Sequence, residues 1–210
     1  STMTYAGTPI KSKPLHANVV ASLPLRAIPF LVRAIPWTKV RAGLEGAWTT
    51  VQGSAWKVTL NELKAEQKVL IGETIVDTEI TKWNEAWYGS ITMKTNVKSR
   101  ATYTTDLRDL KLVWDAARNT ITIILPETRV DSIEDTEWDE RVSYTRARII
   151  FSACTRQALA KATRLEVKAQ SRMEAGKHIA RIRAECVKAL QSVLEEKFQE
   201  IKPGIKVLVE

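Results

Sequence analysis

The stretch that decides the fold runs from Ser143 to Ile201 and reads SYTRARIIFSACTRQALAKATRLEVKAQSRMEAGKHIARIRAECVKALQSVLEEKFQEI. It contains no proline and one glycine, Gly176, so helix can run through nearly all of it. Its apolar residues recur mostly at steps of three and four, the spacing of a helix with one buried face. This predicted buried face consists of Ala158, Ala162, Leu165, Ala169, Met173, Ile179, Ile182, Cys186, Leu190, Val193, Phe198 and Ile201. We expect a long helix, or a helix pair broken near Gly176, that covers strands encoded upstream.

Basic residues accompany this apolar face. Lys161, Arg164, Lys168 and Arg172 follow one another at three- and four-residue steps, and we call them the basic row. Such a row is typical of the solvent side of an amphipathic helix. A phosphate-binding surface has the same composition, although no base-reading motif accompanies it here. Nucleic-acid binding is therefore one of the functions that the sequence leaves open.

Length and composition indicate a globular protein of one domain plus an extension. The chain has 210 residues, of which 44% are hydrophobic, enough to bury a core without disulfides or metal. Its two cysteines, Cys154 and Cys186, have no metal-ligand spacing, which favours buried thiols in a reducing compartment. No apolar run reaches the roughly 18 to 20 residues that span a bilayer, and no signal peptide is visible. We expect a cytoplasmic or membrane-peripheral location, or one within a larger particle.

The net charge of +8 is unevenly distributed. Residues 1–57 carry 7 − 1 = +6, residues 58–142 carry 11 − 16 = −5, and residues 143–210 carry 14 − 7 = +7. An acidic middle between two basic ends favours packing of one copy against another as readily as attraction to phosphate.

The first 57 residues differ from the rest, because they hold five of the seven prolines. This spacing predicts an extended arm with short turns. The arm contains a short repeat, RAIPFLV from Arg26 followed by RAIPWTK from Arg33. We expect it to pack on its own domain or on a neighbouring copy, or alternatively to anchor the protein at a membrane interface. The expected partner contacts are Ile28, Phe30, Leu31, Arg33, Ile35 and Trp37.

The middle of the chain predicts a small, mainly antiparallel sheet. Its expected strands are Val69–Ile80, Ile91–Tyr103, Leu107–Val113, Thr120–Leu125 and a closing strand Ile205–Val209, with a short helix at 61–68. Alternation is clearest in Ile91–Tyr103, where odd positions are mostly apolar and even positions largely charged or polar. The fold class is therefore α+β, with a domain at 58–210 whose strands occupy about 69–130 and whose helical tract occupies about 143–201.

The segment DSIEDTEWDER, from Asp131 to Arg141, is strongly acidic. A calcium loop of the EF-hand type needs ligands at fixed alternate positions and a glycine at the sharp turn, and neither is present. The sequence predicts a solvated acidic loop that could pair with a basic helix or with the arm of a neighbour.

The order of these features resembles the bacterial domain-of-unknown-function family numbered 4230. The resemblance rests on the strand ITIILPE at Ile121–Glu127, the phrase VDSIE at Val130–Glu134, the long alanine-rich charged helix and the closing strand. It covers about residues 56–210. It implies an α+β fold and no catalytic residues. Members of that family typically carry a membrane anchor before the domain, where this chain has its proline-rich arm.

Signals for enzymatic chemistry are poor. The sequence has no glycine-rich phosphate loop, nucleophile elbow, Cys-x-x-Cys pair or paired-histidine motif. His178 and Cys186 lie about 12 Å apart along one helix, too far for a catalytic pair. Glu174 and His178 lie one turn apart, and a surface pair is a better interpretation than a metal site. We expect no catalysis, cofactor, metal or small-molecule substrate.

Together these features favour a non-catalytic structural or scaffolding protein that forms homo-oligomers or joins a larger assembly through its arm. The alternatives are a peripheral membrane protein anchored by the arm and a nucleic-acid-binding protein that uses the basic row.

Overall fold

The computed structural model describes residues 27–35, 37–49, 56–59, 68–86, 89–115, 117–145 and 153–210. They form an α+β fold, as predicted, with two sheets and a long helical tract. The chain divides into two compact units. The first includes Thr74–Ala101 and Ile133–Lys177, and the second includes Thr102–Ser132, His178–Glu210 and the described residues before Thr74.

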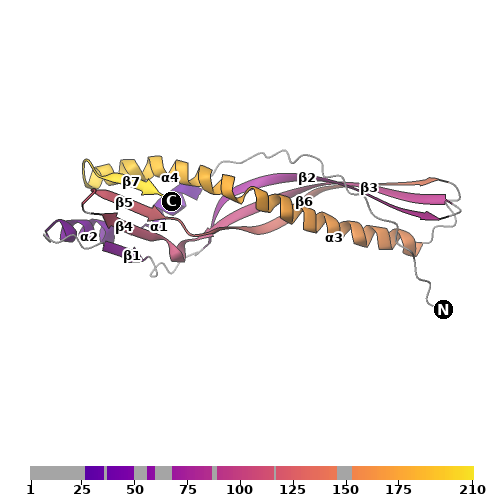
Figure 1. Ribbon diagram of the computed structural model, residues 1–210, viewed down its shortest axis with the longest axis horizontal. Helices are drawn as coiled ribbons and strands as arrows, with labels where there is room; N and C mark the ends of the chain where they lie inside the picture. Colours follow the sequence, from indigo (N-terminus) through magenta and orange to yellow (C-terminus); the bar gives the residue numbers. More distant parts are fainter. Residues whose placement is uncertain are drawn as a thin grey trace. The chain divides into compact units, whose positions relative to one another are not determined.

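The first unit is a three-stranded sheet covered by one helix. Strands β2 (Lys68–Ala86), β3 (Gly89–Asp106) and β6 (Thr128–Thr145) form the sheet in the order β2-β3-β6, and α3 (Ala153–Lys177) lies along it (Figure 1). On β3, odd residues from Ile91 to Thr105 are buried, while Lys94, Asn96, Lys98 and Arg100 are exposed. The predicted alternation is confirmed, so one face of this sheet points to the helix and the other to solvent.

The second unit holds a four-stranded sheet, in the order β1-β4-β5-β7. Its strands are β1 (Trp56–Thr59), β4 (Lys111–Asp115), β5 (Thr120–Ile124) and β7 (Lys206–Val209), and η2 (Leu107–Asp109) precedes β4. The β4–β5 hairpin turns at Asn119, whose φ is 49°. The predicted closing strand does return to the sheet, and it lies parallel to β5 with Ile121 opposite Val207.

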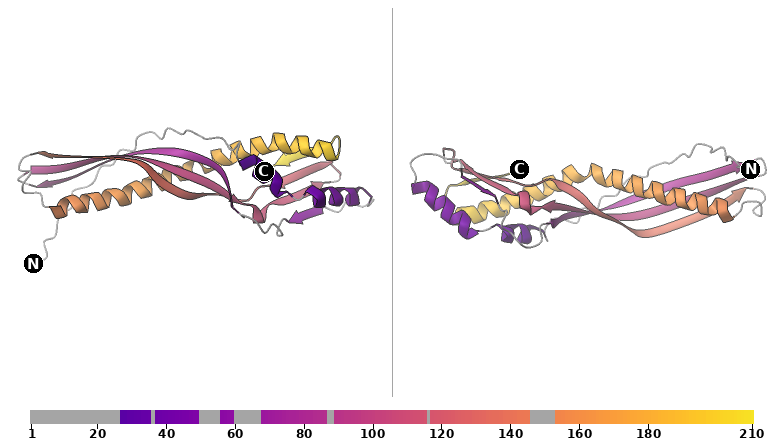
Figure 2. Two further views of the ribbon diagram at one scale, coloured as in Figure 1. Left: turned by 180° about the vertical axis from the view of Figure 1, so that it is seen from behind. Right: turned by 90° about the horizontal axis from the view of Figure 1, so that it is seen from below.

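Helix α4 (Ile179–Ile201) lies beside β7 in the second unit (Figure 2) and buries one of its sides there. Its buried residues are Ile182, Cys186, Leu190, Leu194 and Phe198. The predicted buried face is confirmed here except that Leu194 is buried in place of Val193, which is half-buried like Ile179 and Ile201. The predicted break near Gly176 is confirmed, since α3 ends at Lys177 and α4 begins at Ile179.

The expected extended arm is wrong where the structure describes it. Helices α1 (Ala27–Ala34) and α2 (Trp37–Thr49) occupy this part of the chain. Pro29 falls in the first turn of α1, where a missing amide hydrogen removes no helical hydrogen bond, so the proline spacing does not prevent helix here. Residues 1–26 lie outside the described residues, as do residues 61–67 of the short helix predicted at 61–68, whose last residue Lys68 belongs to β2.

The expected acidic loop is also wrong, because Asp131–Arg141 lies within β6. β6 is an edge strand of its sheet. Edge strands tolerate charge because part of their surface stays in water, and charge there discourages pairing with other strands. Lys98 of β3 also forms an ion pair with Glu137 of β6, with 2.6 Å between Nζ and Oε2. The predicted start of the helical tract at about 143 is wrong as well, because residues 143–145 belong to β6 and α3 begins at Ala153.

Gly72 of β2 allows α4 to approach closely. A Cβ added at Gly72 would stand 2.7 Å from Cγ2 of Ile182, which is buried. We expect Gly72→Ala to lower the free energy of unfolding by about 1 to 3 kcal/mol, because a well-packed core has no room for the methyl group. Urea unfolding followed by circular dichroism measures this change.

The matched control is Gly176→Ala in α3, where an added Cβ meets nothing within 4 Å. This substitution should raise stability by about 0.5 to 1 kcal/mol, because alanine favours helix over glycine. Equal effects of the two substitutions would contradict the close approach of Gly72 to Ile182.

Candidate functional site

Helix α3 presents an unexpected side to the sheet. Its buried residues are Thr163, Val167, Ser171 and Ala175. The predicted buried face is wrong in this helix: Ala158 and Ala169 are exposed, Ala162 is half-buried, and Leu165 and Met173 are 64% and 57% exposed. We call Ala158, Ala162, Leu165, Ala169 and Met173 the apolar stripe. Steps of three and four fit both sides of this helix, so spacing alone did not distinguish them.

Polar contacts hold the buried side of α3 on the sheet. The Ser171 hydroxyl lies 3.2 Å from that of Ser99 and 3.4 Å from that of Thr78. Ser99 in turn donates to Asp135 at 2.7 Å. Because unpaired buried hydroxyls are costly, these partners favour the rotation of α3 that brings Ser171 inward.

A largely buried ion pair fixes the same rotation. Lys82 of β2 is 3% exposed, and its Nζ lies 2.8 Å from Oε2 of Glu166 on α3. Removing one partner would leave the other charge poorly solvated, so the pair resists any turn of the helix that separates the two groups. Lys82 is the last of the buried even-numbered residues 72–82 of β2, but a lone lysine in a strand does not reveal its partner.

The outer side of α3 combines cations with apolar groups. All four members of the basic row are exposed, and each is followed by a member of the apolar stripe: Lys161-Ala162, Arg164-Leu165, Lys168-Ala169 and Arg172-Met173. Successive residues lie about 100° apart around a helix, so the row and the stripe run side by side.

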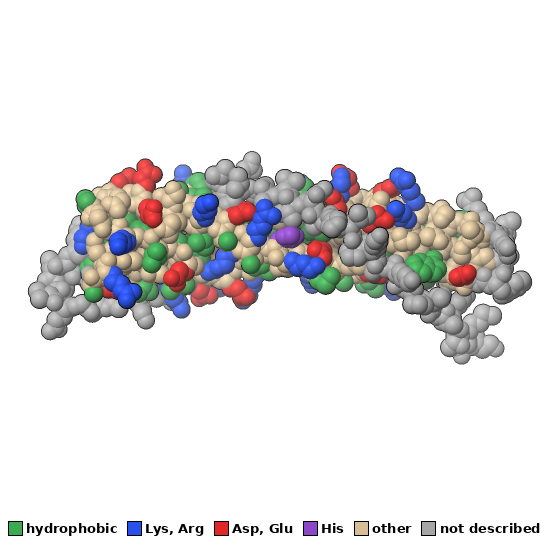
Figure 3. Space-filling view, turned by 45° about the horizontal axis from the view of Figure 1, so that its top comes forward, with side chains coloured by type: hydrophobic (Ala, Val, Ile, Leu, Met, Phe, Trp, Pro, Cys, Tyr) green, Lys and Arg blue, Asp and Glu red, His purple; other side chains and the backbone are tan. Residues whose placement is uncertain are grey.

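Among the described residues, no carboxylate forms an ion pair with the basic row. By contrast, two exposed cations of α4 are paired, Arg181 with Glu185 and Lys197 with Glu200. Figure 3 shows Lys and Arg side chains interspersed with acidic and hydrophobic ones on the face in view. The outer side of α3 thus offers both unpaired positive charge and apolar surface.

The expected partner contacts of the N-terminal segment do not form one exposed surface. Ile28, Leu31 and Ile35 are buried. Trp37 is half-buried: its ring centroid lies 5.2 Å from that of Phe198 on α4, and its Nε1 donates to the Val32 carbonyl.

Arg33 is exposed, and the side chain of Phe30 lies outside the described residues. The expectation that this whole set contacts a neighbour is corrected, because apolar residues that pack in their own core are not available to a partner.

The part of β6 in the first unit forms an acidic edge. Glu134, Asp135, Glu137 and Asp139 are exposed, Glu140 is half-buried, and Trp138 is 37% exposed. The hydrogen bond from Lys98 to Glu137 raises the pKa of Lys98, because it favours the charged form of the amine.

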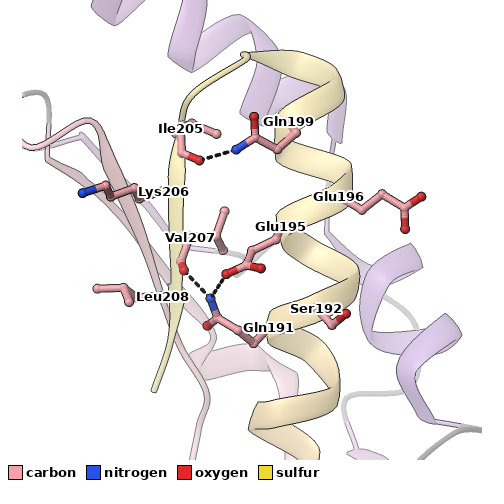
Figure 4. Close-up of a pocket in the computed structure, with 9 residues that line it drawn as sticks. All are labelled: Gln191, Ser192, Glu195, Glu196, Gln199, Ile205, Lys206, Val207 and Leu208. Carbon is pink, nitrogen blue, oxygen red and sulfur yellow. Dashed lines mark hydrogen bonds between the residues drawn. The ribbon is translucent and has the colours of Figure 1, made fainter.

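A shallow groove of about 640 Å³ lies between α4 and β7 in the second unit (Figure 4). Gln191 accepts from the Val209 amide at 2.9 Å and donates to the Val207 carbonyl, and Gln199 donates to the Ile205 carbonyl at 2.7 Å. β7 is an edge strand, and these glutamines bond its outer backbone groups as a neighbouring strand would. The groove is therefore explained by protection of the sheet edge.

The described residues contain no group of three or more His, Cys, Asp or Glu side chains that could hold a metal ion. Glu174 forms an ion pair with Lys177, one turn away. Cys186 is buried, and desolvation raises the pKa of its thiol to about 11, which disfavours the reactive thiolate. Within the described part of the chain, no helix is both long enough and apolar enough to cross a membrane.

No protein-family model matches the chain, and no curated protein or solved structure matches it. The resemblance to the bacterial family numbered 4230 stays a prediction.

Gln191→Glu tests the protection of β7. A carboxylate at this position cannot donate to the Val207 carbonyl and would also face Glu195, which now accepts from Gln191. We expect a loss of about 1 to 3 kcal/mol of unfolding free energy above pH 6, measured in urea. The neighbouring exposed Ser192→Ala is the control and should change stability by less than about 0.5 kcal/mol. An effect of the control as large as that of Gln191→Glu would disprove the role of the glutamine.

Cys186 should make stability depend on alkaline pH. Below pH 9 the thiol holds its proton in both states; between pH 9 and 11 only the unfolded chain ionises, so stability falls. Compared with Cys186→Ala, the wild-type chain should lose about 2 to 3 kcal/mol more over this range. Parallel pH profiles of the two proteins, from urea unfolding, would show that the thiol is not desolvated.

Proposed function

We propose that the chain is a non-catalytic structural or scaffolding protein that assembles with copies of itself or within a larger complex. One observation supports this most strongly: the outer side of α3 exposes Leu165 and Met173 beside a row of cations that have no described ion-pair partner. A rigid helix with exposed large apolar groups is typical of a protein contact surface.

We place the proposed contact on α3 rather than on the N-terminal segment. Ile28, Leu31 and Ile35 are committed to the core of the second unit, and Trp37 packs on Phe198. An assembly that used these residues would first have to unpack that core. The apolar stripe carries no such cost, since its members already face solvent.

Two alternatives use the same outer side of α3. An anionic membrane surface would attract the basic row and accept the apolar stripe, and nucleic-acid phosphates would bind the basic row alone. Three measurements distinguish these functions. Lipid binding appears only with vesicles, phosphate binding weakens steeply with salt, and protein assembly depends on protein concentration.

The double substitution Leu165→Glu, Met173→Glu tests the proposal. Burial of each side chain in an interface would contribute about 1.5 to 3 kcal/mol. The full chain should show a mass above that of a monomer by light scattering, and the variant should need at least tenfold more protein to reach it.

The control is Leu208→Glu, which changes an exposed leucine of β7 and should leave the mass unchanged. A full chain that stays monomeric at all accessible concentrations would contradict the proposal. Flotation with anionic vesicles, or a salt-sensitive shift of DNA, would then favour an alternative.

A further inference from the structure

We infer that the partner of the outer side of α3 is the acidic edge of β6 in a second copy of this chain. This inference rests on the proposed function and names the surface that the apolar stripe and the basic row contact. Both surfaces belong to the first unit, which contains α3 and Ile133–Thr145 of β6.

The two surfaces carry opposite net charge. Helix α3 carries six cations, Arg156, Lys161, Arg164, Lys168, Arg172 and Lys177, against Glu166 and Glu174: 6 − 2 = +4. The Ile133–Thr145 part of β6 carries Arg141 against Glu134, Asp135, Glu137, Asp139 and Glu140: 1 − 5 = −4. Net charges of opposite sign and equal size favour pairing between copies and steer the encounter.

Length and apolar content also match. The 25 residues of α3 span about 37 Å at 1.5 Å per residue. Residues 133–145 span about 43 Å at 3.3 Å per residue, so the two charged surfaces run over similar distances. Trp138, 37% exposed, gives the acidic edge an apolar group for the stripe to contact.

The composition of the stripe favours a protein partner over a lipid surface. Three of its five members are alanine, so only Leu165 and Met173 project far from the helix. Binding to a bilayer strengthens with the apolar area that enters it, and alanine adds little area. Small residues instead allow the backbone of a partner to approach closely.

Antiparallel pairing of α3 with α3 of a second copy is less favourable. The basic row flanks the stripe on one side only, so an antiparallel two-fold pair would place both basic rows on the same side of the contact. Like charges so close together are destabilising. The acidic edge of β6 removes this repulsion.

A contact between two different surfaces of one chain is heterologous. Each copy presents one basic helix and one acidic edge, so the assembly grows head to tail into a ring or an open filament. A scaffolding role follows from such growth.

Complementation between charge-reversed chains tests the inference. Variant A is Arg164→Glu, Arg172→Glu on α3. Variant B is Glu134→Lys, Glu140→Lys on β6; among the described residues neither glutamate has an ion pair. Variant A keeps an acidic edge and variant B keeps a basic helix. We expect each variant alone to need at least tenfold more protein than the wild type to associate, and an equimolar mixture to form a complex containing both chains at the wild-type concentration.

A matched control reverses two cations of α4, Arg181→Glu and Lys197→Glu, with the same change in net charge. It should associate as the wild type does, and circular dichroism should show that all variants are folded. If the wild type associates but the mixture of A and B stays monomeric, or if B associates like the wild type, the β6 partner is wrong while the proposed function stands. A monomeric wild type overturns both.

Discussion

The structure of the first unit depends on the polar contact between α3 and the three-stranded sheet. Ser171 meets the hydroxyls of Ser99 and Thr78, and Lys82 meets Glu166, all at positions that water reaches little. Each of these groups is costly to bury without its partner, so the helix has one favourable rotation. That rotation turns Leu165 and Met173 outward, which is the feature on which the proposed function rests.

Helix α4 obeys a different constraint. Its inward side is bulky, with Leu190, Leu194 and Phe198 buried, and this apolar packing acts together with hydrogen bonds between the helix and β7. The close approach of Ile182 to Gly72 belongs to this packing, while Gln191 supplies hydrogen bonds to the edge strand β7. Two consecutive helices of one tract thus use different chemistry: α4 buries the apolar residues that its sequence offers, and α3 leaves them available for another surface.

Much of the fold could be predicted. The alternation in β3, the break near Gly176 and the returning strand β7 all follow from local spacing, because period and turn residues act over a few neighbours. The errors have specific causes. The N-terminal helices were missed because Pro29 lies in the first turn of α1, where proline removes no helical hydrogen bond. The acidic segment was predicted as a loop, but its carboxylates lie on an edge strand, where Lys98 pairs with Glu137. The candidate surface on α3 was half predicted: the basic row was recognised, and the apolar stripe beside it was assigned to the core.

The sequence by itself determined the α+β class, the two-part helical tract and the exposure of Lys161, Arg164, Lys168 and Arg172, since charge and period require no knowledge of distant residues. Only the tertiary structure decided which side of α3 is buried. Ser171 and Glu166 become inward residues because Ser99, Thr78 and Lys82, some 70 to 90 positions away, offer them partners. The spacing of residues within a helix shows which of its sides could be buried, and the side chains of the facing sheet decide which one is.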